Sequence, residues 1–224
     1  MRTHSPCALG LLGEMRDYWT DLAKERIRRP REDLMSRLVH AEVDGERLAI
    51  PEVCNIANRL LVAGHSSTDM LISNTVLSLD AFPEQRRAVS ADRSLMPRVI
   101  EESLRYLSPI SAVGRGTKVD AEVGGVVIPK DQMIMVWAAA ANRDERQFKN
   151  PHAFDIMREE GGHLAFSRGV HFCLGRRLGR MEAQAAVGRL MDRFPKLRTD
   201  PDNPPEFFQF ADATGVEKLP VLVR

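Results

Sequence analysis

The interpretation of the whole chain starts from one stretch of sequence, Ala165-Phe166-Ser167-Arg168-Gly169-Val170-His171-Phe172-Cys173-Leu174-Gly175-Arg176-Arg177-Leu178-Gly179-Arg180. It combines one cysteine with three glycines and four arginines, and no acidic residue occurs from Gly161 through Met181. Apolar residues after the cysteine recur at roughly helical spacing, which predicts a helix from Leu174 to about Phe194. Cys173 is therefore expected at or just before the N-terminus of a helix.

The surroundings expected for Cys173 favour a thiolate that faces a large, flat ligand. Free backbone N–H groups and the positive end of the helix dipole gather at a helix N-terminus. Such a setting stabilises a thiolate, which is the form of cysteine that ligates metal. Gly169 and Gly175 carry no Cβ on either side of the sulfur, so a planar group can approach the backbone closely. A single thiolate facing a planar anionic ligand suggests heme bound through sulfur.

Three other interpretations of Cys173 stay open from the residues alone. The first is an ordinary buried cysteine beside a basic helix, because free cysteine is among the most buried residue types. The second is a nucleophile paired with His171, although such pairs usually meet across a fold rather than within one loop. The third is zinc, which is disfavoured because Cys7, Cys54 and Cys173 show no Cys-x-x-Cys spacing and a structural site needs four ligands.

The stretch also carries a family pattern. Written as Phe-x-x-Gly-x-His-x-Cys-x-Gly-x-x-Leu-x-Arg, it closely resembles the heme-binding loop of the heme-thiolate monooxygenases, the cytochromes P-450. Two positions depart from that pattern, Ser167 and Gly179, where the family more often has Gly and Ala. The resemblance implies heme b as the cofactor and Cys173 as the axial iron ligand. It also implies that the cofactor-binding loop includes Phe166, Gly169, His171 and Gly175.

A second landmark is a long apolar repeat from Pro51 to about Asp80. Apolar and small residues recur there at spacings of three and four, which predicts one long helix. Its centre reads Ala63-Gly64-His65-Ser66-Ser67-Thr68. Glycine in the middle of a helix costs roughly 1 kcal/mol against alanine, so it usually has a packing or functional reason. Ala63 and Gly64 would let a flat ligand lie against this helix.

The centre of this helix resembles the oxygen-binding helix of the same family, which usually reads Ala-Gly-x-acid-Thr-Thr. The resemblance implies that Ala63 and Gly64 contact the cofactor and that Ser67 and Thr68 take part in catalysis. Ser66 stands where the family has an acid, and Ser67 replaces the oxygen-activating threonine. Asp69, three residues beyond Ser66, is one substitute for the acid. A polar, loosened helix segment is the alternative.

A third motif is Glu102-x-x-Arg105, within a helix expected from Leu95 to Leu107. The two residues are spaced i and i+3, so they share a helix face and can pair. Such a pair alone is a weak signal, but its position matches the Glu-x-x-Arg brace of the family. A later arginine completes that brace in the family. Ala153 fills the expected slot here, and Arg146 and Arg158 are the candidates for this third member.

The segment after Ser108-Pro109 changes from helical to strand-like patterns. Strands are expected at 113–119, 123–128 and 133–137, followed by a closing strand near 219–223. Arg115, in the first of them, matches a family position that often reaches a heme propionate, and a solvated strand arginine is the alternative. The fold class expected is mainly α with a small antiparallel β region, as in the cytochrome P-450 fold with its N-terminal part missing.

Composition places limits on the class of protein. The 224 residues are 43% hydrophobic, enough for one sizeable core, and the net charge is only +1. No bulk charge points to nucleic acid or a membrane as a partner. Three widely spaced cysteines fit a reducing, cytoplasmic setting rather than a disulfide framework. Residues 1–224 are expected to form a single partial heme-thiolate catalytic domain.

The resemblance covers essentially the whole chain, which matches only the C-terminal portion of a bacterial, soluble-type family member. The N-terminal part normally supplies the other wall of the heme pocket and most of the substrate pocket. The apolar faces of the long helix are therefore expected to lack a cover, which predicts a marginal fold unless a partner supplies one.

The function implied by the resemblance is insertion of one oxygen atom from O2 into a small organic substrate. Electrons would come from NAD(P)H through a ferredoxin or similar acidic donor with its reductase. The basic surface at Arg168, Arg176 and Arg177 is the expected docking face, by charge complementarity. Two alternatives remain, a non-catalytic heme-binding or protein-interaction remnant and a peroxide-driven heme-thiolate enzyme.

Overall fold

The computed structural model describes residues 6–159 and 161–224 of the chain. Its described part is mainly helical, with short two-stranded antiparallel sheets, as the sequence predicted. The contacts within the chain define two compact units, one ending at His65 and the other beginning at Ser66. Each unit is described by itself, and the single domain expected over 1–224 stays a prediction.

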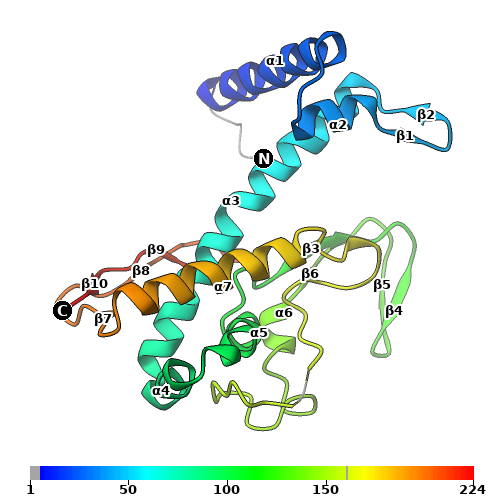
Figure 1. The fold of residues 1–224 in the computed structure, drawn as a ribbon. Coiled ribbons are helices and arrows are strands. Elements are labelled where there is room, and N and C mark those ends of the chain that lie inside the picture. Colours follow the sequence, from blue (N-terminus) through cyan, green and yellow to red (C-terminus); the bar gives the residue numbers. More distant parts are fainter. Residues whose placement is uncertain (1–5, 160) are drawn as a thin grey trace. The chain divides into compact units, whose positions relative to one another are not determined.

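The first unit is organised around a capped helix. Asp33 is the N-cap of this helix and accepts a hydrogen bond from the backbone N–H of Ser36 at 2.8 Å. Arg26 also donates to the Asp33 carboxylate, and this bond lowers the pKa of Asp33 to about 2. The elements are α1 (Pro6–Arg28), α2 (Leu34–His40), the hairpin strands β1 (Glu42–Val43) and β2 (Glu46–Arg47), and the first part of α3 (Ile50–Ala81) (Figure 1).

The first two residues of α2 differ in burial. Leu34 is 57% exposed, and Met35 takes the buried position. A helix of seven residues makes less than two full turns, so its sequence pattern cannot fix which face is buried. The core is formed by Ala23, Met35, Val39, Val53 and Ala57.

The second unit holds the remaining helices and the other sheets. Antiparallel pairs join β3 to β6, β4 to β5, β7 to β10 and β8 to β9. The strands predicted at 113–119, 133–137 and 219–223 match β3, β6 and β10, whereas the single strand predicted at 123–128 is divided by a turn between β4 and β5. The short strands β7, β8 and β9 were not predicted. The elements are α4 (Pro83–Ala91), a 3₁₀ turn (Arg93–Leu95), α5 (Met96–Tyr106), β3 (Val113–Gly116), β4 (Ala121–Val123), β5 (Val126–Ile128), β6 (Met133–Val136), α6 (Ala138–Ala141), a 3₁₀ turn (Gly169–His171), α7 (Arg176–Arg193), β7 (Arg198–Thr199), β8 (Glu206–Phe207), β9 (Val216–Lys218) and β10 (Val221–Leu222).

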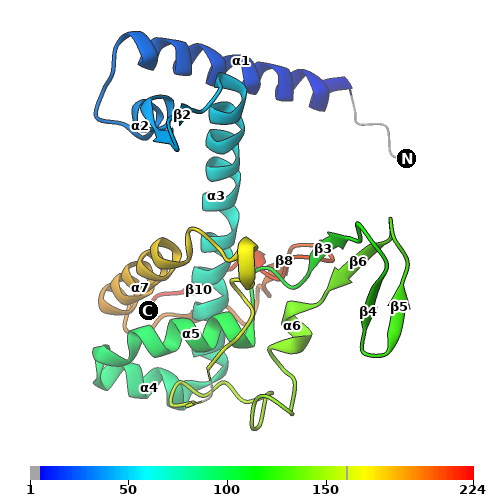
Figure 2. The same ribbon diagram turned by 90° about the vertical axis from the view of Figure 1, so that its right-hand side faces the viewer.

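The core of the second unit lies where α5 and α7 pack together beside the second part of α3 (Figure 2). From α7 the core takes Ala183, Val187 and Met191. The apolar residues at the start of this helix, Leu178 and Met181, are instead 52% and 62% exposed. The spacing therefore predicted the helix correctly, but its apolar residues do not form one buried stripe.

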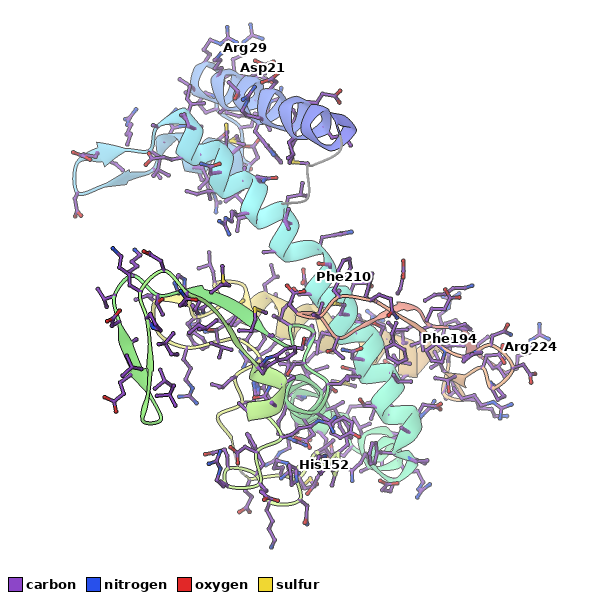
Figure 3. All side chains as sticks on the ribbon, turned by 180° about the vertical axis from the view of Figure 1, so that it is seen from behind. Asp21, Arg29, His152, Phe194, Phe210 and Arg224 are labelled. Atoms are coloured by element: carbon purple, nitrogen blue, oxygen red, sulfur yellow. The ribbon has the colours of Figure 1, made fainter. Side chains whose placement is uncertain are left out.

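Two contacts hold α3 to the C-terminal segment. The side-chain amide of Asn74, which is fully buried, donates to the carbonyls of Leu107 at 3.0 Å and Thr214 at 2.9 Å. The backbone of Gly215 lies so close to Met70 that a Cβ there would be 2.8 Å from the Met70 Cβ. Phe194 and Arg224 lie toward the end of this unit where β10 pairs with β7 (Figure 3).

A buried arginine joins α5 to the segment after α6. Arg105 is 2% exposed, and each of its five N–H donors has an acceptor. Two donors reach the Glu102 carboxylate at 2.7 and 2.8 Å. The other three reach the backbone carbonyls of Asn142, Pro151 and Ala153 at 2.8–3.0 Å. The guanidinium therefore fixes both a helix and a loop that has no regular structure of its own.

Glu102 is held from the loop side as well. Its carboxylate accepts the backbone N–H of Asp155 at 2.9 Å and the Nε of Arg158 at 3.3 Å. Arg158 is almost fully buried, whereas Arg146 pairs with Asp144 at the surface. Of the two candidates, the structure thus places Arg158 on the Glu102–Arg105 pair.

Replacing Gly215 with alanine should destabilise the protein, because its new Cβ would overlap Met70, and overpacking typically costs about 1–3 kcal/mol. Gly188→Ala is the matched control. Gly188 lies within α7, and a Cβ there meets no described atom within 4 Å, so alanine should stabilise the helix by about 0.5–1 kcal/mol. Urea denaturation followed by circular dichroism measures both effects. Equal stabilisation by the two substitutions would contradict the close approach of Gly215 to α3.

Replacing Arg158 with alanine should lower the free energy of unfolding by about 1.5–3 kcal/mol, the range for hydrogen bonds to charged groups. The matched variant Arg146→Ala removes an arginine whose side chain is 88% exposed, so it should leave stability unchanged within error. Urea denaturation followed by circular dichroism measures the free energy of unfolding of both variants. A larger loss in Arg146→Ala would mean that the third member of the brace has been misidentified.

Candidate functional site

The cysteine loop, residues 163–175, leads directly into α7. The structure places Cys173 two residues before Gly175, the N-cap of this helix. The backbone N–H of Cys173 donates to the carbonyl of Phe166 at 3.0 Å, and its own carbonyl accepts from Arg176 at 3.2 Å. The half-buried thiol is not part of a disulfide. The loop thus fixes the backbone on both sides of the sulfur.

The tight turn of the loop needs an unusual backbone conformation at two positions. Ser167 and Gly169 have φ angles of 60° and 69°, in the left-handed region that glycine adopts without steric cost. Ser167 is the position at which the resembling family more often has Gly. That preference now has a local reason, since a residue with a side chain is strained there.

The surroundings of Cys173 fit a flat, apolar group bound to sulfur. A Cβ at Gly169 or Gly175 would meet no described atom within 4 Å, so the backbone has open space on both sides of the cysteine. Val170 and Leu174, beside it, are 98% and 83% exposed. Clustered apolar side chains in the open are typical of a surface that another group covers. A porphyrin has the shape and the apolar faces that this loop would accept.

The residues expected to contact a propionate lie on different elements. His171 is exposed at the end of the 3₁₀ turn of the loop. Arg115 lies in β3, opposite Ile134 of β6, and donates to the carbonyl of Gly114 at 2.9 Å. No hydrogen bond or ion pair joins Arg115 to the described residues of the cysteine loop. A shared contact of the two with one ligand therefore stays a prediction.

The residues expected on the oxygen-binding helix do lie at the centre of α3. Ala63 and Gly64 belong to the first unit, and a Cβ on Gly64 would meet no described atom within 4 Å. Ser67 and Thr68 belong to the second unit and are half-buried. The Thr68 hydroxyl would be 3.7 Å from a Cβ at Gly179, so it lies against α7.

Sequence reasoning missed a charged cluster beside the loop, formed by Glu101, His163 and Arg180. Two nitrogens of Arg180 donate to the two carboxylate oxygens of Glu101, and His163 Nε2 lies 3.1 Å from Glu101 Oε2. Burial alone would raise the pKa of Glu101, but the bonds to His163 and Arg180 outweigh it and lower this pKa to about 2. The bond to Glu101 raises the pKa of Arg180, against the effect of burial, and the charge of nearby Cys173 adds to that rise.

A buried amide connects the loop to the Glu102–Arg105 brace. Asn142 is fully buried, and its side-chain oxygen accepts the backbone N–H of Leu164 at 2.6 Å. Its nitrogen donates to Ser108 Oγ at 2.8 Å, and its backbone carbonyl accepts from Arg105. The arginine that braces α5 therefore also positions the residue that holds the start of the cysteine loop.

A pocket of about 920 Å³ lies between α5 and the loop. Two charged groups of the unit face it, the Glu102–Arg105–Arg158 brace and the Glu101–Arg180 pair. Phe166 and Phe172 add apolar surface, while Cys173 is not among the lining residues.

Other kinds of site find no support among the described residues. No group of three His, Cys, Asp or Glu side chains there could hold a metal ion, and the side chain of Cys7 lies outside the described part. Cys54, a buried free thiol, lies 3.7 Å from the Thr20 hydroxyl. Every helix that the structure describes is too short or too polar to span a lipid bilayer.

Comparison with known proteins identifies the fold. A solved structure from a study of unusual cytochrome P450-like monooxygenases in microbial secondary metabolism is 60% identical, with a TM-score of 0.93 over 96% of this chain and 58% of that one. The himastatin-biosynthesis hydroxylase HmtN is 51% identical, with a TM-score of 0.90 over the same shares.

The curated relatives agree. Cytochrome P450 107B1 of Saccharopolyspora erythraea is 46% identical over 210 residues, which are 92% of this chain and 52% of that protein. The chain thus spans about half the length of the curated relatives it matches. The family model described as Cytochrome P450 matches residues 16–221. The chain belongs to the cytochrome P450 family.

Proposed function

We propose that this chain carries the heme-thiolate part of a monooxygenase, with Cys173 as the axial ligand of heme b. The observation that carries the proposal is the cysteine loop. Its free thiol stands just before α7, with open space at Gly169 and Gly175 and exposed apolar neighbours. The family membership of the chain supports the same assignment.

The proposed roles follow from where each side chain lies. When bound, heme iron supplies O2 activation and the transfer of one oxygen atom to an organic substrate. Cys173 would hold the iron through its thiolate, a type of ligand that favours O–O bond cleavage. The Phe166 carbonyl holds the Cys173 amide and so orients the sulfur. Ser67 and Thr68, on α3, would take part in catalysis by holding or passing a proton through their hydroxyl groups, and Thr68 also lies against Gly179 of α7.

Two further groups of residues have proposed roles at the cofactor. Ala63, Gly64, Phe166, Gly169 and Gly175 would line its faces, and His171 and Arg115 would meet its propionates. The Glu102–Arg105 pair would act from a distance, because it is buried among protein groups and fixes the loop segments that lead to Cys173.

The proposed partners are a small organic substrate and an acidic electron donor of the ferredoxin type, whose reductase draws on NAD(P)H. Arg168 and Arg177 are exposed on the cysteine loop and the first turn of α7, and Arg176 stacks on Phe172 at 4.4 Å. Three cations near the sulfur would attract an acidic surface. We propose a cytoplasmic setting for this electron transfer, in keeping with the free thiols of Cys54 and Cys173.

One observation favours a second candidate function. Ser66, at the position where the family has an acid, is exposed on α3 and supplies no carboxylate for proton delivery. A peroxide-driven heme-thiolate enzyme, or a heme-binding remnant without turnover, would tolerate this change. Substrate turnover by the hemin-loaded chain, with NADPH and a surrogate reductase in one arm and hydrogen peroxide in the other, separates the three functions.

The Cys173→Ala variant should lose the absorption spectrum that thiolate ligation gives. Purified chain is titrated with hemin, reduced and exposed to carbon monoxide, and the difference spectrum is recorded. The native chain should show the red-shifted band of a thiolate-bound heme. Cys54→Ala, which removes a buried thiol in the first unit, should keep it. An unchanged spectrum in Cys173→Ala would overturn the proposed ligand.

A further inference from the structure

We propose that Glu101, His163 and Arg180 are positioning residues for Cys173. They form a cluster that holds the cysteine loop in the conformation in which its sulfur faces the iron. The inference rests on the proposed function, because Cys173 needs positioning only if it binds iron. The contacts among the three residues are observed in the chain without heme. None of the three residues touches the reacting atoms, so each would act through the loop.

The carboxylate of Glu101 is the centre of the cluster. It projects from α5 and receives both arms of the Arg180 guanidinium, with an Nη2–Oε2 distance of 2.9 Å. Paired N–H donors on one carboxylate fix orientation as well as distance, which a single lysine contact cannot do. Since Arg180 belongs to α7, this pair sets the position of the helix that begins after the loop.

His163 extends the cluster to the backbone of the loop. The N–H of Ala165 points at His163 Nδ1 across 3.3 Å, so Nδ1 must be an acceptor there. The ring proton of the neutral imidazole is then on Nε2, where it donates to Glu101. One side chain in this tautomer connects a helix carboxylate to a loop amide.

Arg180 completes the connection to the cysteine. Its guanidinium lies over the ring of Phe166, with Cζ 4.4 Å from the ring centre. The carbonyl of the same Phe166 accepts the N–H of Cys173. The path from Glu101 to the cysteine backbone therefore runs through one ion pair, one cation–π contact and one hydrogen bond.

Two consecutive acidic residues of α5, Glu101 and Glu102, hold different parts of the cysteine loop. Glu102 is 5% exposed and belongs to the Arg105 brace, which reaches the loop at Leu164 through Asn142. Glu101 has a side chain that is 43% exposed and reaches the loop at His163 and, through Arg180, at Phe166. Loss of Glu101 should therefore loosen the turn around Cys173 while the buried brace stays intact.

Amide hydrogen exchange in the hemin-free chain tests the proposal. Glu101→Gln and Arg180→Gln should each raise exchange by about tenfold in peptides that contain Cys173, the factor expected for the loss of one charged hydrogen bond. The variant that combines Glu101→Gln with Arg180→Gln should exchange as fast as each single variant, because each single substitution already removes the same ion pair. Arg180→Lys should recover only part of the protection, since it keeps the charge and loses the second donor.

The matched control is Asp192→Asn, which removes the ion pair that Arg93 makes with α7 at 2.9 Å but has no connection to the loop. It should leave exchange at Cys173 unchanged. Equal exchange in the control and the cluster variants, or a rise spread over the whole second unit, would overturn the positioning role.

The hemin-loaded variants provide the second readout. Glu101→Gln and Arg180→Gln should convert part of the reduced, carbon monoxide-bound protein to the form without thiolate ligation, whereas Asp192→Asn should not. An unchanged spectrum in both cluster variants would mean that the loop reaches its conformation without them. Because exchange is measured without heme, failure of the proposed function would leave that first result intact.

Discussion

The guanidinium of Arg105 is the constraint on which the rest of the second unit depends. A charge that is almost fully buried is tolerated only when it is paired and hydrogen-bonded. Arg105 meets this demand with Glu102 and with backbone carbonyls of Asn142, Pro151 and Ala153. Those carbonyls belong to a segment without helix or strand, so the arginine determines where that irregular segment must lie.

The order imposed by Arg105 passes to the cysteine loop. Asn142, held by its carbonyl, presents its side-chain oxygen to Leu164, and the loop begins there. A second anchor comes from Glu101 of the same helix, through Arg180 and His163. Cys173 thus stands on a loop fixed from two positions of α5, Arg105 and Glu101. The loop backbone that carries Cys173 is held by these contacts. The exposed surroundings of the sulfur leave room for a flat ligand.

Much of this arrangement could be predicted from the sequence. The spacing of apolar residues predicted α3 nearly to the residue, and the cysteine motif indicated the family. Contacts between side chains that are far apart in the sequence could not be predicted. Glu101 contacts residues 62 and 79 positions away, and neither Arg180 nor His163 shows any periodic relation to it. Arg158 and Arg146 were indistinguishable for the same reason, since only burial separates them. The exposed start of α7 shows that helical spacing alone does not tell which face is covered.

X-ray absorption at the iron edge of the hemin-loaded ferric chain tests the central claim most directly, because it identifies the atoms bound to the metal. If Cys173 holds the iron, the native protein shows a sulfur scatterer in the first shell, and Cys173→Ser shows only nitrogen and oxygen. A first shell without sulfur in the native chain, or sulfur that persists in Cys173→Ser, would contradict ligation by this cysteine.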